Sequence, residues 1–474
     1  MNSIKILAGP LLFLIAILYA ILVHAPMPVC AVIGTALWMI YWWITETVSM
    51  AVTALLPMIV FPIFGVMDAK AVAPAYGNSV VYLFMGGFIL ALALEKWNLH
   101  KRIALFIIQK TGSTAKGLLL GIMLSTGFIS MWISNTATAV MMLPIATSLL
   151  AVLESHHEKQ LHDNLTKSML LGIAYASNIG GMATLIGTPP NVVFAAYMSE
   201  HHHQTIGFGR WMLFATPLSF LLLLFAWYLM AYILFPLGKQ HYDNLQQNVT
   251  SQFTALGKIK GGERKVLVVF IATCISWMSR EYILKLLPVG INVSDTTIAL
   301  ASAVMLFLLP AEEHKRILEW KDTQKLPWGI LLLFGGGLCL ADGLEKQGLI
   351  QLISQLFDGL GNNLFLTILI LATLSVVMTE FLSNVAQVTI LLPVMTGIAK
   401  GFGLPPYYLI IPMTLAASCG FMLPMGTPPN AIVFSTGELK IKDMMQTGIW
   451  INLASVILIT LFCYLLVPVL FINI

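Results

Sequence analysis

The chain contains one stretch that is too long, and too polar at its centre, to form a single membrane helix. Residues 117–153 run for 37 positions without an Asp, Glu, Lys or Arg, whereas a membrane helix needs only about 20 apolar residues. Ser134, Asn135 and Thr136 interrupt this run, and such residues end one helix and cap the next. We therefore expect two half-helices that meet at a polar tip inside the membrane, because non-helical backbone at this depth must be buried in protein or line a wet cavity.

An ordinary helical hairpin with an uncharged loop is the alternative, but the same device recurs at Ser383, Asn384 and Val385. Of the 474 residues, 58% are hydrophobic and 10% are charged, whereas a soluble domain carries about 25% charged residues. We predict an all-α polytopic membrane protein with two re-entrant hairpins, at about 115–153 and 364–400. The eleven predicted transmembrane helices cover residues 4–23, 28–44, 47–66, 79–95, 167–197, 211–236, 264–287, 294–310, 327–345, 405–434 and 446–472.

The positive charges predict how these helices are oriented. Lys and Arg concentrate on the side that holds Lys5, residues 96–116 and the polar connector 238–262, and the positive-inside rule makes this side cytoplasmic. We expect a multi-pass protein of the cell (inner or plasma) membrane, with the N-terminus in the cytoplasm and the C-terminus outside. Residues 4–23 are interpreted as a retained first helix and not as a signal peptide. The lipid bilayer is therefore an expected partner, and nucleic acid is not.

The second half of the chain repeats the motifs of the first half in the same order. The paired motifs are Leu83-Phe84-Met85-Gly86-Gly87 with Leu333-Phe334-Gly335-Gly336-Gly337, Ser134-Asn135 with Ser383-Asn384, and Gly187-Thr188-Pro189-Pro190-Asn191 with Gly426-Thr427-Pro428-Pro429-Asn430. Because the paired elements are five spans apart, the two halves face opposite ways across the membrane. Inverted repeats with interrupted helices are typical of secondary transporters, with the site at the midplane. We interpret the glycine-rich pair as a site of close helix packing.

Four helix starts are predicted to meet at this site. Thr188 and Thr427 precede paired prolines and so mark helix starts, and the second arms of the hairpins begin after Asn135 and Asn384. Helix N-termini favour an anion, and the carbonyl groups where the first arms end favour a small hard cation. No Lys or Arg lies near the four breaks in the sequence. A bound dianion would therefore need cations such as sodium to neutralise it.

The sequence does not decide the roles of some polar residues. Glu380 precedes Asn384 by four positions, and it is either a functional intramembrane carboxylate or a structural one that accepts hydrogen bonds. The run His201-His202-His203 is a candidate metal site, but we expect a solvated outer loop instead. Asp342 lies near a span end and is interpreted as structural.

Two other classes of function remain as alternatives. An anion channel would use the same helix dipoles, but it would need no paired cation sites. An intramembrane enzyme would need a nucleophile with a base or a metal triad. The nearest match, His157-Glu158, lacks the second His of the H-E-x-x-H motif, so we expect a transporter and not an enzyme.

From Trp42 to Phe434 the chain resembles the divalent anion:sodium symporter family, which includes sodium/dicarboxylate and sodium/citrate cotransporters. The motifs that carry the resemblance are Trp97-Asn98-Leu99-His100-Lys101-Arg102, Trp132-Ile133-Ser134-Asn135-Thr136-Ala137, Thr379-Glu380-Phe381 with the second Ser-Asn pair, and the two Thr-Pro-Pro-Asn segments. The resemblance implies a sodium-driven importer of C4 dicarboxylates such as succinate, malate and fumarate. A sodium-independent dicarboxylate exchanger and a citrate or sulfate carrier are the alternatives within the family.

The resemblance also implies an architecture and a set of binding residues. It implies a homodimer that works as an elevator, with scaffold parts at 1–114 and 263–360 and transport parts at 115–262 and 361–474. The first sodium site would use Ser130, Ser134, Asn135 and Gly187, and the second would use Thr379, Leu382, Asn384 and Gly426. The dicarboxylate would contact Asn135, Thr136, Asn384, Val385, Thr427 and Pro428. Val385 stands where many relatives have Thr, so one hydroxyl contact is absent.

Overall fold

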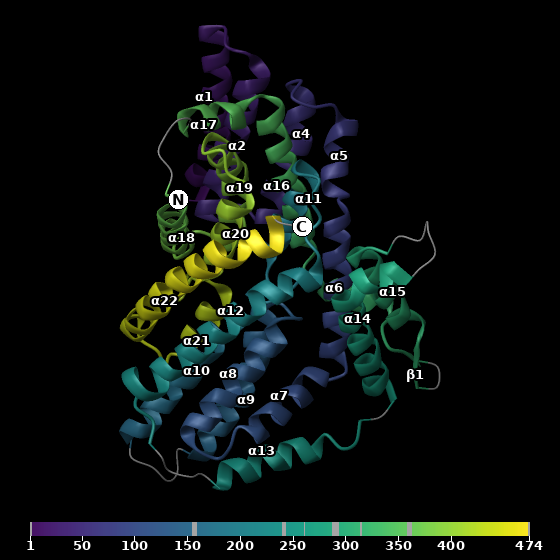
Figure 1. Ribbon diagram of the computed structural model, residues 1–474, viewed down its shortest axis with the longest axis vertical. Helices are drawn as coiled ribbons and strands as arrows, with labels where there is room; N and C mark the ends of the chain where they lie inside the picture. Colours follow the sequence, from purple (N-terminus) through teal and green to yellow (C-terminus); the bar gives the residue numbers. More distant parts are fainter. Residues whose placement is uncertain are drawn as a thin grey trace.

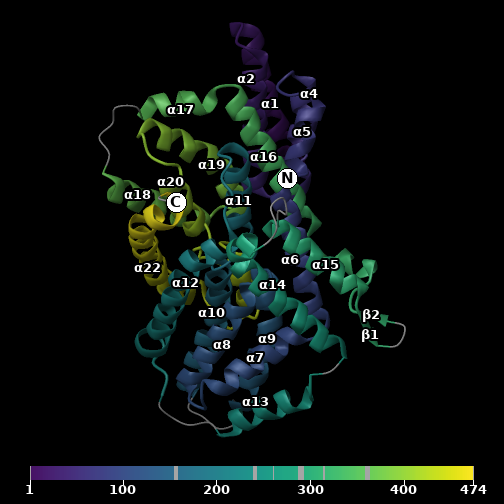
Figure 2. The same cartoon turned by 45° about the vertical axis from the view of Figure 1, so that its right-hand side comes forward.

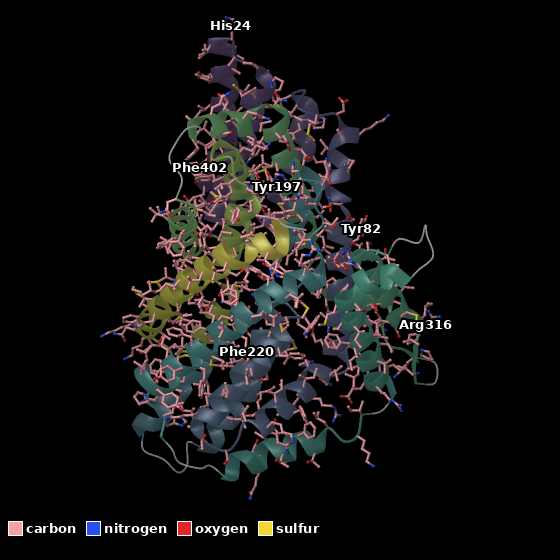
Figure 3. All side chains as sticks on the ribbon, in the orientation of Figure 1. His24, Tyr82, Tyr197, Phe220, Arg316 and Phe402 are labelled. Carbon is pink, nitrogen blue, oxygen red and sulfur yellow. The ribbon has the colours of Figure 1, made fainter. Side chains whose placement is uncertain are left out.

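The structure, a computed structural model, describes residues 2–153, 159–238, 243–259, 261–286, 293–312, 315–357 and 363–472. Figure 1 shows a molecule built almost entirely of helices. The one sheet among the described residues pairs β1 (Pro310–Glu312) with the antiparallel β2 (Lys315–Arg316), and Figure 3 shows Arg316 at the edge of the molecule. The predicted all-α class is therefore confirmed.

Several helices are long and apolar enough to cross a membrane. The described residues contain six such stretches, Lys5–Val23, Met27–Thr45, Ala69–Lys96, Phe208–Leu234, Trp328–Lys346 and Ile441–Ile472. They contain, in order, α1 (Asn2–Val23), α2 (Met27–Thr45), α5 with α6 (Ala69–Tyr76 and Ser79–Lys96), α12 with the π-helix η1 (Phe208–Tyr228 and Leu229–Leu234), α16 (Trp328–Lys346), and α22 with the π-helix η3 (Ile441–Val467 and Pro468–Ile472). The long helix α14 (Gly261–Leu286) stands at the predicted span 264–287. Shorter or interrupted helices stand at the other predicted spans and at the two hairpins.

Both hairpins break where the sequence predicts. The first consists of α8 (Ala115–Ser130) and α9 (Asn135–Leu153), and the second consists of α18 (Leu364–Thr379) and α19 (Asn384–Gly401). Their starts are capped alike, because Thr114 Oγ1 accepts a hydrogen bond from the Gly117 N–H at 3.1 Å and Asn363 Oδ1 accepts one from the Leu366 N–H at 3.1 Å. The repeat seen in the sequence therefore extends to the capping chemistry.

The two Thr-Pro-Pro motifs each start the second arm of a broken helix. The first broken helix consists of α10 (Lys159–Met182) and α11 (Pro189–His201), and the second consists of α20 (Tyr407–Ala416) and α21 (Pro428–Phe434). Thr188 and Thr427 occupy the N-cap positions, with prolines in the first turn. Proline is tolerated there because the N–H that it lacks would have no partner inside the helix.

Two stretches differ from the predicted spans. The span predicted at 47–66 is divided into α3 (Met50–Thr53) and α4 (Leu56–Ile63), because Pro57 starts a new helix. The helix α5 was not predicted, and it extends α6 into a longer apolar stretch. The remaining elements are α7 (Leu99–Lys110), α13 (Asp243–Ala255), α14 (Gly261–Leu286), α15 (Asp295–Leu308), the 3-10 helix η2 (Trp320–Lys325) and α17 (Leu349–Phe357).

The two repeats interlock at the centre of the molecule. The helix α21 of the second repeat packs against α9 and α10 of the first, while α11 of the first packs against α19 and α20 of the second. In both views α8, α9 and α10 lie toward the end that holds α13, and α1, α2, α4 and α17 lie toward the opposite end (Figures 1 and 2). Each broken helix therefore brings its break against parts of the other repeat.

The paired glycine-rich motifs are points of close helix approach, as the sequence predicts. A Cβ atom on Gly86 would lie 2.7 Å from the Cβ of Ala299, and one on Gly336 would lie 2.3 Å from the carbonyl oxygen of Ala54. Both distances are too short for any side chain. These glycines pack α6 against α15 and α16 against the segment after α3.

Candidate functional site

The tip of the first hairpin gathers oxygen atoms around Asn135, the first residue of α9. Ser130 Oγ donates a hydrogen bond to the carbonyl oxygen of Ser177 at 2.7 Å, and it lies 2.8 Å from Asn135 Oδ1. If the Asn135 amide is turned over, its nitrogen lies 3.1 Å from the Ser177 oxygen and 3.2 Å from the Gly187 oxygen. The structure thus brings together Ser130, Asn135 and Gly187 of the predicted first cation site.

Ser134 has a different role at this tip. Its Oγ accepts a hydrogen bond from the Ala137 N–H at 3.4 Å, which caps the start of α9. The sequence predicts it as a cation ligand, and that role stays a prediction.

Two glycines make room for this cluster. A Cβ atom on Gly181 would lie 2.3 Å from Asn135 Oδ1, and one on Gly187 would lie 2.5 Å from the Gly181 oxygen and 2.9 Å from the Ser130 oxygen. The backbone of the first broken helix therefore lies directly against the hairpin tip, and carbonyl oxygens line the space between them. Carbonyl and side-chain oxygens are the ligands that hard cations prefer. Gly181 was not predicted, because nothing in the sequence distinguishes it from other packing glycines.

The second hairpin repeats this geometry. Thr379 Oγ1 donates to the Ala417 oxygen at 2.5 Å and lies 2.8 Å from Asn384 Oδ1. The carbonyl oxygens of Thr379 and Gly426 are each 3.4 Å from the position of a Cβ atom on Gly420. Three of the predicted second-site residues, Thr379, Asn384 and Gly426, are thus gathered at one place. The fourth, Leu382, lies in the break, where its N–H donates to the Met378 oxygen at 2.9 Å.

The predicted substrate residues lie at the starts of α9, α19 and α21. Thr136 and Pro428 are exposed, Asn135, Asn384 and Val385 are half-buried, and Thr427 is buried. Asn178 of α10 donates from Nδ2 to Thr427 Oγ1 at 2.8 Å, and its Oδ1 lies 3.4 Å from Asn135 Nδ2. With the Asn135 amide nitrogen turned toward Asn178, hydrogen bonds among the described residues join Asn135 to Thr427 across the two repeats, but they do not extend to Asn384 or Val385.

The last residue of each Thr-Pro-Pro-Asn motif holds its helix break together. Asn191 Nδ2 donates to the oxygens of Met182 and Thr184 at 3.1 and 2.8 Å, and Asn430 Nδ2 donates to those of Gly420 and Leu423, both at 2.9 Å. These carbonyls are released when the first arm ends, and unpaired buried carbonyls are costly. The sequence predicts no role for Asn191 or Asn430, although both occupy the same position in the two Thr-Pro-Pro-Asn motifs.

Glu380 accepts four hydrogen bonds at the second break. Its Oε1 accepts hydrogen bonds from the N–H groups of Phe421 and Met422, both at 2.9 Å, and from Asn452 Nδ2 at 2.7 Å. Its Oε2 accepts a hydrogen bond from the Leu423 N–H at 3.0 Å. The carboxylate therefore fixes the loop between α20 and α21 to the hairpin tip and to α22. This geometry favours the structural of the two roles that the sequence left open.

The first residue of the histidine run, His201, does not lie in a solvated loop. The side chain of His201, the last residue of α11, is 5% exposed, with Nδ1 2.6 Å from Glu345 Oε2 and Nε2 3.4 Å from Asp342 Oδ1. Tyr197, labelled in Figure 3, packs its ring against the ring of His201 at a tilt and donates to Thr396 Oγ1 at 3.0 Å. The expectation of a solvated loop is wrong for His201, because α11 continues as a helix to this residue. Within the described part of the chain, no group of His, Cys, Asp and Glu side chains has the arrangement of a metal site.

Several charged side chains of the described residues form ion pairs with one another. The closest-packed pair joins Arg102 to Glu263, with Nε and Oε1 2.5 Å apart, and another joins Lys167 to Asp443 at 2.9 Å. The predicted site residues themselves carry no ionisable side chain. A bound anion would be held here by helix starts, amides and hydroxyls.

Comparisons with known proteins agree with this architecture. The family model for the sodium:sulfate symporter transmembrane region matches residues 7–472. The sodium-dependent dicarboxylate transporter SdcS of Staphylococcus aureus strain MRSA252 is 38% identical over 476 residues, which cover 98% of this chain and 91% of that protein. The SdcS proteins of strains NCTC 8325 / PS 47 and USA300 match to the same extent. The predicted family resemblance is therefore confirmed, and the chain belongs to the sodium:sulfate symporter family of membrane transporters, also described as divalent anion:sodium symporters.

Proposed function

We propose that this protein imports C4 dicarboxylates such as succinate, malate and fumarate, driven by sodium. The observation that carries the proposal is the pair of repeat-related oxygen clusters, one around Asn135 and one around Asn384, each between a hairpin tip and a broken helix. Sodium is a hard cation that suits such oxygen ligands. The related SdcS proteins are named as sodium-dependent dicarboxylate transporters, which favours dicarboxylate over sulfate or citrate. Membership of a transporter family excludes the enzyme alternative.

The proposed substrate site lies beside both clusters. One carboxylate of the dicarboxylate would meet the start of α9 and the other the start of α19, with Thr427 and Pro428 of α21 alongside. The helix starts supply free N–H groups and partial positive charge. Two sodium ions would supply the remaining charge, since the predicted site residues include no Lys or Arg. An anion channel would not need this pair of clusters.

The elevator mechanism, the homodimer and the orientation are part of the same proposal. The proposed transport elements pack on one another through α10 with α8 and α9, and through α20 with α18 and α19. They meet the proposed scaffold where α11 and α19 pack against α16. The connector helix α13, which we place in the cytoplasm, and α17, which we place outside, lie at opposite ends of the molecule (Figure 1). Light scattering of the solubilised protein would test the dimer.

The proposal is tested by uptake of radiolabelled succinate into proteoliposomes, with and without an inward sodium gradient. We expect uptake to require sodium and to rise more steeply than linearly with its concentration, because two sites must fill. Uptake that ignores sodium but is stimulated by dicarboxylate on the opposite side would establish the exchanger instead. Uptake that does not saturate with succinate would favour a channel.

Gly181→Ala is expected to weaken sodium binding at the first site. The new methyl group would lie 2.3 Å from Asn135 Oδ1, so the amide must move away from the other oxygens. We expect the sodium concentration for half-maximal uptake to rise by about tenfold or more, which corresponds to about 1.4 kcal/mol. Gly77→Ala is the control, because its methyl group would have no atom closer than 3.8 Å. Equal sodium dependence in both variants would remove Gly181 from the site.

Val385→Thr tests whether position 385 lines the substrate site. Val385 corresponds to Thr136 in the other repeat, so its methyl group stands where the repeat has a hydroxyl. A restored hydrogen bond contributes about 0.5–1.5 kcal/mol, which predicts a change in apparent succinate affinity of a few-fold up to about tenfold. The change should differ for citrate, because only polarity is altered and not size. Uptake measured for both anions checks this, and unchanged affinities for both would place Val385 in protein packing.

A further inference from the structure

Asn178 lies between the first cation cluster and the start of α21, and no part of the proposed function yet assigns it a role. It is 1% exposed and lies in the last turns of α10. Its Nδ2 donates to Thr427 Oγ1 at 2.8 Å, and its Oδ1 accepts from Asn135 Nδ2 at 3.4 Å. A buried asparagine thus links Asn135 of the first repeat to Thr427 of the second.

The link depends on which way the Asn135 amide faces. An amide presents an acceptor oxygen on one side and a donor nitrogen on the other. When Nδ2 faces Asn178, Oδ1 faces the oxygens of Ser177 and Gly187, and the Ser130 hydroxyl is 2.8 Å away. A cation bound among these oxygens would favour this orientation. When the amide is turned, Nδ2 donates to Ser130 Oγ at 2.8 Å and to the Ser177 and Gly187 oxygens at 3.1 and 3.2 Å. The Asn135 oxygen then faces Asn178 Oδ1. Because both atoms are acceptors, no hydrogen bond joins the two residues in this arrangement.

The state of Asn178 in turn decides where the Thr427 hydroxyl proton points. In the linked arrangement Thr427 Oγ1 accepts from Asn178 Nδ2 at 2.8 Å and from the Asn430 N–H at 3.4 Å. A hydroxyl has two acceptor lone pairs and one proton, so the proton is left for a third partner. If Asn178 loses its bond to Asn135 and turns over, its oxygen accepts the Thr427 proton instead.

We propose that Asn178 is a positioning residue that couples the first cation site to the substrate site. A sodium ion at the first site holds Asn135 Oδ1, which directs Asn135 Nδ2 to Asn178 and leaves the Thr427 hydroxyl free to donate to a substrate carboxylate. Without the ion the Asn135 amide turns, and Thr427 donates to Asn178. This inference rests on the proposed sodium-coupled transport, and it assigns the coupling to a relay of three side chains.

The second repeat lacks this relay. Aligning Ser177 with Ala417 pairs Asn178 with Ser418, which is fully buried and whose Oγ has no hydrogen-bond partner among the described residues. The relay therefore serves one cation site and not the other. The unequal repeats provide a matched control within the same chain.

The test compares Asn178→Leu, which keeps the branched shape and the number of heavy atoms but removes the amide, with the control Ser418→Ala. Sodium binding without substrate is measured with radioactive sodium, and succinate binding is measured at low and at saturating sodium. In the wild type we expect sodium to strengthen succinate binding strongly. In Asn178→Leu we expect the factor by which sodium increases succinate affinity to fall by about tenfold. Sodium affinity without substrate should change little, because Ser130, Asn135 and Gly187 remain. Ser418→Ala should behave as the wild type.

The reciprocal measurement separates coupling from damage. Linkage requires succinate to strengthen sodium binding by the same factor, so this factor should fall equally in Asn178→Leu. Thr427→Val removes the other end of the relay, and the double variant should lose no more coupling than either single variant. If Asn178→Leu is not monodisperse, Asn178→Ser, which carries the side chain of the second repeat, takes its place with the same expectation.

The outcomes distinguish the two proposals. Succinate binding that is independent of sodium in the wild type would overturn sodium coupling itself. Strong coupling in the wild type that persists undiminished in the Asn178 variant would overturn the relay and leave the transport function standing. Additive losses in the double variant would also overturn the relay.

Discussion

Replacing Asn135 or Asn384 by alanine is expected to abolish sodium-driven uptake while leaving the protein folded. Each side chain stands at the centre of an oxygen cluster, 2.8 Å from Ser130 Oγ in one repeat and from Thr379 Oγ1 in the other. Each also starts the helix that we place against a substrate carboxylate. The alanine removes a cation ligand and an anion contact together, so both binding steps weaken at once. Succinate uptake into proteoliposomes measures the effect.

The folded state of these variants is checked separately. Both asparagines are only half-buried at a hairpin tip, so we expect monodisperse protein with a Tm close to that of the wild type. Asn248→Ala on the connector helix α13 is the matched control, and it should transport normally. Wild-type uptake in either purified hairpin variant would contradict the assignment of the site.

The second large effect is expected in stability. Glu380→Leu leaves three backbone N–H groups and the Asn452 amide without the acceptor that they share in the native structure. Each unsatisfied buried donor costs about 1–3 kcal/mol. We therefore expect the free energy of unfolding to fall by more than about 4 kcal/mol, a decrease that is typical of broken buried hydrogen-bond networks. Glu380→Gln keeps one acceptor oxygen and should lie between the wild type and Glu380→Leu. Heating the solubilised protein and measuring the monodisperse fraction gives the order of the three.

A control shows whether burial causes this effect. Glu438 lies exposed between α21 and α22, and Glu438→Leu should leave the Tm nearly unchanged. If Glu380→Leu were as stable as the wild type, the four hydrogen bonds would not hold the second break. Lost transport with unchanged stability would instead restore the functional role that the sequence left open.

Local chemistry made the helix breaks predictable from the sequence. Ser134 and Asn135, like Ser383 and Asn384, and the two Thr-Pro-Pro motifs act on the backbone next to them. Their effect therefore does not depend on the rest of the fold. The division of 47–66 near Pro57 has the same local cause. The sequence prediction of one continuous span relied instead on the apolar composition of this stretch.

Other parts of the site depend on partners that are distant in the sequence. Asn178 looks like any polar residue in a membrane helix, and only the packing of α10 against α21 brings it to Thr427. The sequence does not distinguish Gly181 from the other glycines, because only the fold shows that the hairpin tip packs against it. His201 reads as part of a loop until Asp342 and Glu345 are found beside it. The sequence predicts where the chain breaks, and the fold decides what meets at each break.

The interlocking of the repeats also has a consequence for how the protein is made. Asn178 and Thr427 are 249 residues apart in the chain, and translation adds about 5–20 residues per second. The first hairpin and the first broken helix are therefore synthesised roughly 10–50 s before α21, and they cannot pack against it during this interval. During that time their polar tip must be sheltered by water, lipid headgroups or the insertion machinery. Slow synthesis of the second half would prolong the period in which the newborn chain is most exposed to quality control.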